Sequence, residues 1–321
     1  MSWSATLKNR QQLRAQIEVG EDIGIMFSDI RGFAAYTAEK GDRAAYHLSQ
    51  LHTGLLKERL EEHGGVLVKT LGDGIMAAFA YPADGIASAV TIQRAIRARN
   101  QTSPDEPIDV GIGLASGRPV VSEVDMIGHS VNLSQRISGL AKGGQILVTE
   151  RIQDRVRLPE GLRYLPLGGQ RLKGLGHELL YEILWMGEVA RLSDAEDRFT
   201  LVLTEKGTVV LELAKQVQAE IDEALKRDEH EKEGAFSAFL SHAVARITKK
   251  IIDSSLGAFG IAREQDLDQV ELSLKRNHLA VRLGKKELRL RGVDVADART
   301  FMTRLAEFKQ KRRHHPSSQD S

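Results

Sequence analysis

Cysteine is absent from all 321 residues of the chain. Without thiols the protein can form no disulfide, no thiolate zinc site and no cysteine nucleophile. Neither sign of charge dominates, because 45 Lys and Arg residues stand against 44 Asp and Glu residues, for a formal net charge of +1. This balance excludes a chain-wide basic field of the kind that attracts nucleic acid, and we expect no nucleic-acid partner.

Long apolar runs are missing as well. A membrane-spanning helix needs about 20 consecutive apolar residues, and no run approaches that length. Residues 1–21 form a polar N-terminal segment without the apolar stretch of a signal peptide. We therefore expect a cytoplasmic protein with no membrane segment. The chain length favours two domains, each large enough to bury a core.

The first part of the chain, about residues 22–186, alternates short apolar runs with helical patterns, which predicts an α+β domain. Residues 23–27 are almost wholly apolar and predict a buried strand, and a helix follows over 43–62. Strands at 66–69 and 75–79 flank a glycine-rich turn, which predicts a hairpin. The other expected elements are helices over 82–98 and 130–140 and strands at 108–115, 145–148 and 179–184.

Residues 191–310 predict a second, accessory module. Apolar residues recur every three or four positions from Val210 to Leu225 and from Phe236 to Ile251, which predicts two amphipathic helices. Period-two patterns then predict a three-stranded antiparallel meander, with strands near 270–274, 279–283 and 288–290, and a last helix follows over 295–309. Residues 311–321 are polar and basic, and we expect a disordered tail.

Two aspartates stand at positions suited to metal chemistry. Asp29 follows the apolar strand and precedes a glycine turn into a helix, and Asp73 lies between two glycines at the tip of the hairpin. If the hairpin pairs beside the first strand, the two carboxylates converge. Paired carboxylates can share two Mg²⁺ ions that activate a hydroxyl and clamp a polyphosphate. Taken alone, Asp29 reads more simply as the N-cap of a helix.

Three separated motifs carry a resemblance to a known family. They are FSDIRGF at 27–33, KTLGDG at 69–74 and DMIGHSVNLSQR at 125–136. In their order and internal spacing they resemble the signature segments of class III nucleotidyl cyclases, the adenylate and guanylate cyclase catalytic domain. The resemblance implies that residues 22–186 form a ferredoxin-like βααββαβ cyclase domain. The whole chain would then be an α+β protein with a second α/β module.

The resemblance implies metal and catalytic roles for five residues. Asp29, Asp73 and the backbone carbonyl of Ile30 would bind two divalent cations, Mg²⁺ or Mn²⁺. Asn132 and Arg136 lie one helical turn apart, so both face the same side of their helix. In the family the asparagine orients the ribose, and the arginine neutralises charge that develops on the α-phosphate.

The resemblance also implies five substrate contacts. Backbone amides from residues 30–33, including Gly32 and Phe33, would hold the triphosphate, and Lys173 would touch the phosphates. Lys69 and Asp125 would read the base. A lysine donor suits N1 of adenine and a carboxylate accepts from its exocyclic amine, which favours ATP over GTP. Cytosine offers a similar acceptor beside an amine, so a cytidylate or uridylate cyclase of a bacterial anti-phage signalling system is the alternative.

Further expectations concern assembly and regulation. Family members build each site from two chains, so the resemblance implies a homodimer with two equivalent sites. The connection over residues 117–125 is shorter than usual in the family, and Ser134 and Gln135 replace smaller residues at what would be the edge of the purine pocket. The accessory module resembles no family that we can name, and it would receive an unknown signal or effector. An alternative of another class is a catalytically silent, nucleotide-sensing cyclase-like module.

Overall fold

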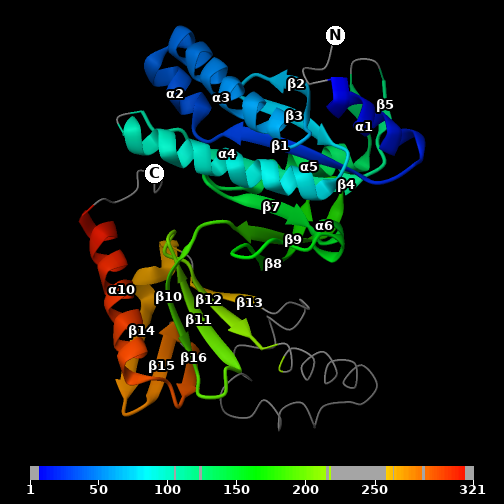
Figure 1. The fold of residues 1–321 in the computed structure, drawn as a ribbon. Coiled ribbons are helices and arrows are strands. Elements are labelled where there is room, and N and C mark those ends of the chain that lie inside the picture. Colours follow the sequence, from blue (N-terminus) through cyan, green and yellow to red (C-terminus); the bar gives the residue numbers. More distant parts are fainter. Residues whose placement is uncertain are drawn as a thin grey trace. The chain divides into compact units, whose positions relative to one another are not determined.

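The structure is a computed structural model, and it places two compact units in the chain. One unit comprises Met1–Glu160 and Gly169–Leu184, and the other comprises Gly161–Gly168 and Trp185–Ser321. Figure 1 shows the ribbon of both units. In the part of the chain that the structure describes, no helix combines the length and apolar character needed to cross a membrane. The described residues are 7–104, 106–122, 125–214, 217, 258–262, 264–283 and 286–314.

A seven-stranded sheet forms the centre of the first unit, in the order β2-β3-β1-β4-β7-β9-β8. The middle strand, β1, pairs antiparallel with both β3 and β4, and β4 pairs parallel with β7. Helices cover both faces of β1, which explains why its sequence is a continuous apolar run. The strands are β1 Ile23–Ile30, β2 Val66–Leu71, β3 Gly74–Phe79, β4 Val110–Gly117, β7 Ile146–Thr149, β8 Arg163–Leu172 and β9 Gly176–Leu184.

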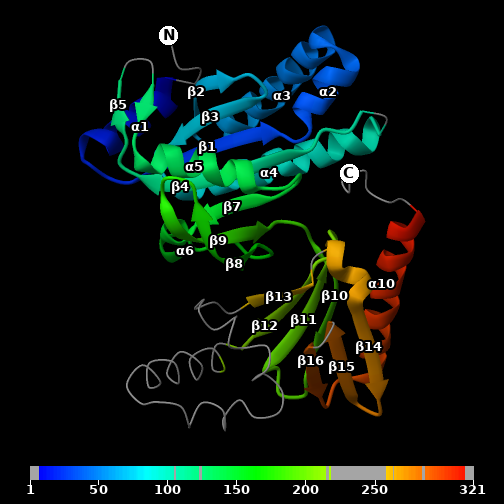
Figure 2. The same cartoon turned by 180° about the vertical axis from the view of Figure 1, so that it is seen from behind.

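The helices of the first unit lie on opposite faces of this sheet (Figures 1 and 2). A Cβ on Gly85 of α4 would lie 3.0 Å from the Leu114 side chain of β4. The neighbouring Gly113 instead faces α5, and successive strand residues point to opposite faces. The helices are α1 Leu7–Glu18, α2 Phe33–Lys40, α3 Asp42–Glu62, α4 Pro82–Thr102, α5 His129–Leu140 and α6 Glu150–Arg155.

Very close packing fixes α5 on the sheet. A Cβ on Gly113 would lie 2.3 Å from the backbone nitrogen of Ser138 and 2.7 Å from the carbonyl oxygen of Ser134, so only glycine permits this approach. The Ser134 hydroxyl, fully buried, lies 2.8 Å from the carbonyl oxygen of Ile25 and 2.9 Å from that of Gly113. The expectation that Ser134 lines the edge of the purine pocket is therefore wrong, because its hydroxyl bonds the helix to the sheet.

Most elements of the first unit agree with the expectations, and the order β1, α2, α3, β2, β3, α4, β4 confirms the βααββαβ arrangement. The apolar side chains of α3 are only partly buried. Leu56 and Leu60 are buried, whereas Tyr46 and Leu51 are exposed. The polar N-terminal segment contains α1, whose Leu13 packs in a core cluster with residues of β1, β2 and β3. A few apolar side chains in a mostly polar helix were too weak a signal to predict this docking.

The second unit contains a four-stranded sheet, β10-β11-β12-β13, and a three-stranded sheet, β14-β15-β16. The expected meander and final helix are confirmed, but α10 continues to His314, so 311–314 are helical and not a disordered tail. Residues 315–321 and the helix expected over 236–251 lie outside the described residues. The elements are β10 Glu188–Ser193, β11 Phe199–Thr204, β12 Val209–Leu213, β13 Ala258–Ala262, the short 3-10 helix Glu264–Gln269, β14 Val270–Lys275, β15 His278–Leu283, β16 Lys286–Arg291 and α10 Val295–His314.

The helix expected to begin at Val210 is wrong at its start, because Val209–Leu213 forms β12. Val209, Leu211 and Leu213 alternate along this strand and pack in the core cluster of the unit. Val210, on the other face, is also fully buried. Because both faces of β12 are covered, its apolar residues do not alternate strictly with polar ones. The same sequence therefore fits the spacing of a helix equally well.

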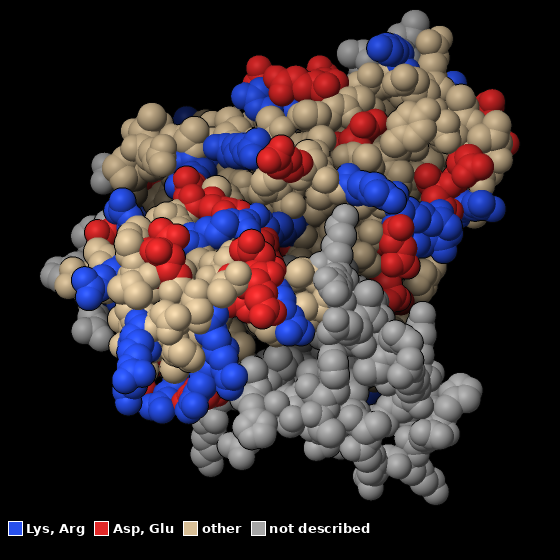
Figure 3. Space-filling model, turned by 60° about the horizontal axis from the view of Figure 1, so that its bottom comes forward, with Lys and Arg blue, Asp and Glu red and all other residues tan. Residues whose placement is uncertain are grey.

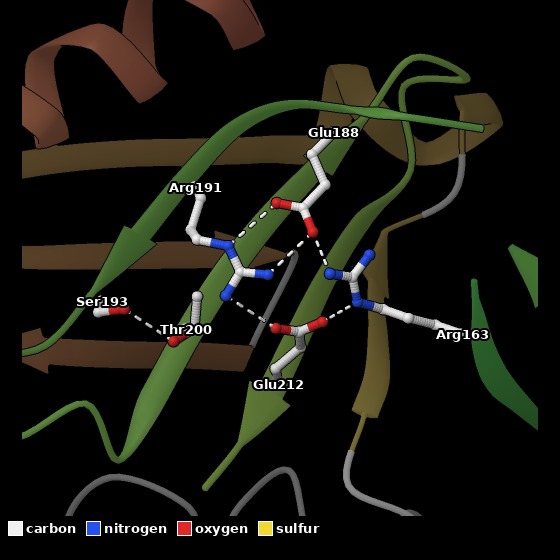
Figure 4. Close-up of polar contacts among 6 residues, drawn as sticks. All are labelled: Arg163, Glu188, Arg191, Ser193, Thr200 and Glu212. Carbon is white, nitrogen blue, oxygen red and sulfur yellow. Dashed lines mark hydrogen bonds and ion pairs between the residues drawn. The ribbon is translucent and has the colours of Figure 1, made fainter. Parts of the chain in front are cut away.

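Four charged residues form a closed network in the second unit (Figure 4). Arg191 lies 2.8 Å from Glu188 and 3.1 Å from Glu212, and Arg163 contacts both glutamates. Two positive and two negative charges therefore balance each other. The hydrogen bond from Arg191 lowers the pKa of Glu188 below its usual value. Arg163 thus links residues 161–168, which belong to the second unit, to β10 and β12. Figure 3 shows basic and acidic side chains interspersed on one face of the molecule, in keeping with the net charge.

Candidate active site

Strand pairing brings Asp29 and Asp73 together. Asp29 pairs in register with Gly74, the first residue of β3, and Asp73 precedes that residue in the turn between β2 and β3. Gly74 is needed here, because a Cβ on it would lie 2.6 Å from the carbonyl oxygen of Ser28 and 3.6 Å from Oδ1 of Asp29. Burial and, next, the negative charge of Asp29 raise the pKa of Asp73 to about 6. The two carboxylates therefore repel each other at neutral pH.

The side chain of Arg31 is a further part of this site that the sequence did not predict. Its Nη2 atom lies 3.1 Å from Oδ2 of Asp29 and donates to the carbonyl oxygen of Ser138 at 2.9 Å. Gly111 of β4 leaves room for it, since a Cβ there would lie 2.8 Å from the guanidinium nitrogens. A cation favourably meets the carbonyl end of a helix. Arg31 therefore connects Asp29 to the end of α5. The only sequence signal was a basic residue two positions after an aspartate in the first motif.

The donor set around Asp29 and Asp73 fits hard divalent cations. Two carboxylates with an unfavourable mutual repulsion become favourable partners once positive charge lies between them. Among the described residues, no group of three or more His, Asp and Glu side chains forms a complete cage. Mg²⁺ commonly takes one or two carboxylates and completes its shell with water and substrate phosphates. The Ile30 carbonyl lies in the same strand end, next to Asp29.

The turn after β1 offers backbone donors for an anion. Gly32 has a left-handed conformation, with φ of 72°, and α2 begins at the next residue, Phe33. The first amides of a helix lack partners within the helix and favour phosphate groups. The amide of Arg31 is already used, because it donates to the carbonyl oxygen of Asp109 at 2.7 Å. The expectation that all amides of residues 30–33 hold the triphosphate is therefore too broad, and Gly32 and Phe33 are the better candidates.

Lys69 and Asp125 form a bidentate ion pair. The Lys69 Nζ atom lies 2.8 Å from Oδ1 and 2.7 Å from Oδ2 of Asp125. Both side chains are about one-third exposed, at 30% and 33%. The hydrogen bond from Lys69 lowers the pKa of Asp125. Asp125 also accepts from the amide of Met126 at 2.8 Å, which fixes its orientation. One donor and one acceptor are therefore presented side by side.

Asn132 and Arg136 are exposed on α5, and Lys173 is exposed in the turn between β8 and β9. Among the described residues none of the three has a side-chain partner. Val68, Met126 and Val131 are the immediate sequence neighbours of Lys69, Asp125 and Asn132, and they pack in one core cluster. β2, the segment of Asp125 and the start of α5 therefore meet at this cluster. The structure thus brings the start of α5 near the Lys69–Asp125 pair. It gives no comparable contact between Lys173 and the other candidates.

Known proteins resemble the first unit. A family model of the adenylate and guanylate cyclase catalytic domain matches residues 15–184. An adenylate cyclase from Anabaena cylindrica is 30% identical over 170 residues, which cover 45% of this chain and 33% of that protein. A putative adenylate cyclase 3 from Rhizobium meliloti is 29% identical over 132 residues, covering 39% of this chain and 22% of that protein. The chain thus spans a third or less of the length of these two relatives.

Solved structures show the same likeness. The guanylyl cyclase Cya2 is 25% identical, with a TM-score of 0.43 over 51% of this chain and 93% of that chain. An adenylate/guanylate cyclase/hydrolase from Silicibacter pomeroyi is 26% identical, with a TM-score of 0.44 over 51% of this chain and 96% of that chain. The family model covers more than half of the residues and includes all three motifs. The chain therefore belongs to the adenylate and guanylate cyclase family.

Proposed function

We propose that the protein is a nucleotidyl cyclase that converts ATP to the 3′,5′-cyclic monophosphate and pyrophosphate. The convergence of Asp29 and Asp73 beside the turn at Gly32 carries this proposal, because it joins a cation site to backbone donors for phosphate. We propose a cyclase domain over residues 22–186 and an accessory module over 191–310. The accessory module would receive an effector or stabilise a dimer.

The side chains of the site suit each part of the reaction. The 3′-oxygen forms a bond to the α-phosphorus, the bond to the leaving pyrophosphate breaks, and the hydroxyl proton leaves to solvent. Amides of Gly32 and Phe33 hold the phosphates, Asn132 orients the ribose, and Arg136 balances charge on the α-phosphate. Two bound Mg²⁺ or Mn²⁺ ions would supply the acidity of the 3′-hydroxyl and charge neutralisation at the leaving group.

The Lys69–Asp125 pair supports ATP as substrate. Lys69 donates where adenine N1 accepts, and Asp125 accepts where the exocyclic amine donates. Guanine reverses this pattern, so both protein groups would lose partners. The relatives from Anabaena cylindrica and Rhizobium meliloti are an adenylate cyclase and a putative adenylate cyclase, which supports ATP as the substrate. CTP is the alternative substrate that this pair also fits, because cytosine presents a ring-nitrogen acceptor beside an exocyclic amine. UTP, the other pyrimidine alternative, presents N3–H beside a carbonyl, as guanine does, so the pair favours it less.

Two apolar side chains support a homodimer. Val120 of β5 (Val120–Val121) pairs directly with Ile127 of β6 (Met126–Ile127), and these side chains are 75% and 66% exposed. A neighbouring pair of exposed apolar residues on a projecting hairpin is typical of a surface that a partner covers. The connection over residues 117–125, although short, still forms one strand of this hairpin. We propose that each active site takes residues from both chains.

One assay tests the proposed function. The purified protein is incubated separately with ATP, GTP, CTP and UTP in the presence of Mg²⁺ or Mn²⁺, and the products are separated by chromatography. Formation of cyclic AMP and pyrophosphate at the highest rate is the expected result. A higher rate with CTP or UTP would replace ATP by a pyrimidine substrate. Absence of any cyclic product with all four nucleotides would favour the silent nucleotide-sensing module.

A further inference from the structure

A second charged cluster lies at the opposite end of β1 from the aspartate pair. Asp22 immediately precedes β1, and its carboxylate contacts Arg118, Arg151 and Arg155. Arg151 Nη2 lies 2.6 Å from Oδ2, Arg118 Nε lies 3.3 Å from Oδ1, and Arg155 Nη1 also contacts Oδ2. The Asp22 side chain is only 5% exposed, whereas each arginine side chain is more than half exposed. Solvent and small ligands can therefore reach the arginines.

The cluster carries two positive charges more than its single carboxylate balances. Arg151 and Arg155 stand one turn apart on α6, and Arg118 follows β4, so three like charges from two segments meet at one point. Like charges at such spacing repel each other. One arginine is enough to pair a buried aspartate, so stability alone does not account for three. Glu150 and Asp154 lie beside Arg151 and Arg155 on α6, so the charges around the cluster are mixed. It is the three converging guanidinium groups that suit a phosphate group, which carries between one and two negative charges at pH 7.

The arginines also have unused hydrogen-bond donors. Each guanidinium offers five N–H groups in a planar fork that suits phosphate oxygens. Within the described residues, all three side chains make their contacts with the Asp22 carboxylate. Oδ1 of Asp22 accepts no hydrogen bond from the described residues, so Arg118 holds it by charge alone. Arg118 can therefore turn its fork toward another acceptor without breaking a hydrogen bond.

We propose that Arg118, Arg151 and Arg155 bind a phosphate group, either free inorganic phosphate or the phosphate of a small nucleotide. This site is distinct from the candidate active site of the same chain. Asp22 and Asp29 lie at opposite ends of one strand, roughly 23 Å apart at about 3.3 Å per residue. The proposal does not depend on the cyclase activity, because it rests on the charge and donors of the cluster.

Calorimetric titration of the metal-free, full-length protein with inorganic phosphate at constant ionic strength tests the proposal. Without metal, the negative Asp29 and Asp73 disfavour phosphate at the candidate active site. We expect saturable binding that weakens about tenfold or more in the Arg151→Gln/Arg155→Gln variant and about threefold in Arg118→Gln. Arg94→Gln, which removes an exposed arginine of α4, should leave the affinity unchanged. AMP binding that is tighter than phosphate binding and that is lost in the Arg151→Gln/Arg155→Gln variant would assign the nucleotide as the source, and equal binding of both would assign free phosphate.

Arg118→Gln keeps the test independent of folding, because Arg151 and Arg155 still hold Asp22 in that variant. Asp22→Asn provides a result of opposite sign: removal of the competing carboxylate should tighten phosphate binding several-fold. Two results would overturn the proposal. One is the absence of saturable phosphate binding to the wild type, and the other is equal affinity in the wild type and in the folded arginine variants. Either would show that the cluster only holds α6 and the segment after β4 against β1.

Discussion

Lys69 and Asp125 form a bidentate ion pair at 2.7 and 2.8 Å, although 56 positions separate them in the chain. The pair neutralises itself in the free protein and offers one donor and one acceptor to a base. A base with the matching pattern can take up both groups. A base with the reverse pattern leaves each unpaired, at a cost of about 1–3 kcal/mol per group.

We therefore expect at least a tenfold preference for ATP over GTP, and Lys69→Glu should remove it. The variant should lose most of its ATP rate while inhibition by pyrophosphate stays unchanged, because Lys69 reads the base and not the phosphates. Steady-state kinetics with both nucleotides provides the measurement. Lys57→Glu, an exposed lysine of α3, is the matched control. An equal loss with ATP and GTP would contradict a base-reading role.

Asp73→Asn should stabilise the metal-free protein and abolish its activity. The pKa of Asp73 is raised to about 6, from 3.8, so its ionised form is disfavoured in the folded state. The protonated Asp73 side chain makes its full contribution to the free energy of unfolding below pH 3.8, and this contribution is lost as the pH rises through about 6. At pH 7.5 the variant should gain about 1 kcal/mol after allowance for screening of a half-buried group.

Thermal unfolding with EDTA and with Mn²⁺ tests this expectation. Mn²⁺ should raise the melting temperature of the wild type and leave Asp73→Asn nearly unchanged. The advantage of the variant in EDTA should shrink as the pH falls from 7.5 to 5. A variant that is less stable than the wild type in EDTA at every pH would show that Asp73 supports the hairpin and does not repel Asp29.

Arg31→Gln should loosen the end of α5 and disturb the aspartate pair together. Loss of the cation removes its hydrogen bonds to the carbonyl oxygens of Ser138 and Gly139, at about 1 kcal/mol. It also removes a positive charge that lowers the pKa of Asp73. Hydrogen exchange should therefore speed up near residues 138–141, and Mn²⁺ binding should require a higher pH. Unchanged exchange there would contradict the link between Asp29 and α5.

The proposed sharing of sites between two chains predicts complementation. Asp29→Ala and Arg136→Ala should each be inactive alone, because each removes one half of every site. After mixing and subunit exchange, one of the two sites in a heterodimer is intact, so about a quarter of wild-type activity should return at equal concentrations. Activity assays combined with native mass spectrometry provide the test. Heterodimers that form without regaining activity would refute the shared site.

Local patterns in the sequence were sufficient for much of the first unit. Apolar runs and glycine turns indicated β1 and the β2–β3 hairpin, because strand and turn preferences act over a few neighbouring residues. The motifs around Asp29, Asp73 and Lys69 pointed to the candidate site for the same reason. The meander of the second unit followed from its period-two pattern, which is clear because one face of that sheet is exposed.

Contacts between distant segments required the tertiary structure. β12 was misread as the start of a helix because both of its faces are buried, and Ser134 was misplaced because its hydroxyl bonds to carbonyls far away in sequence. The link from Arg31 to Ser138 and the three arginines around Asp22 join residues more than 90 positions apart. The sequence by itself determined which residue types and short motifs were available, because local propensity and pattern are encoded there. Only the packing of sheet and helices decided which of those charges meet, because electrostatic partners are chosen by distance in space.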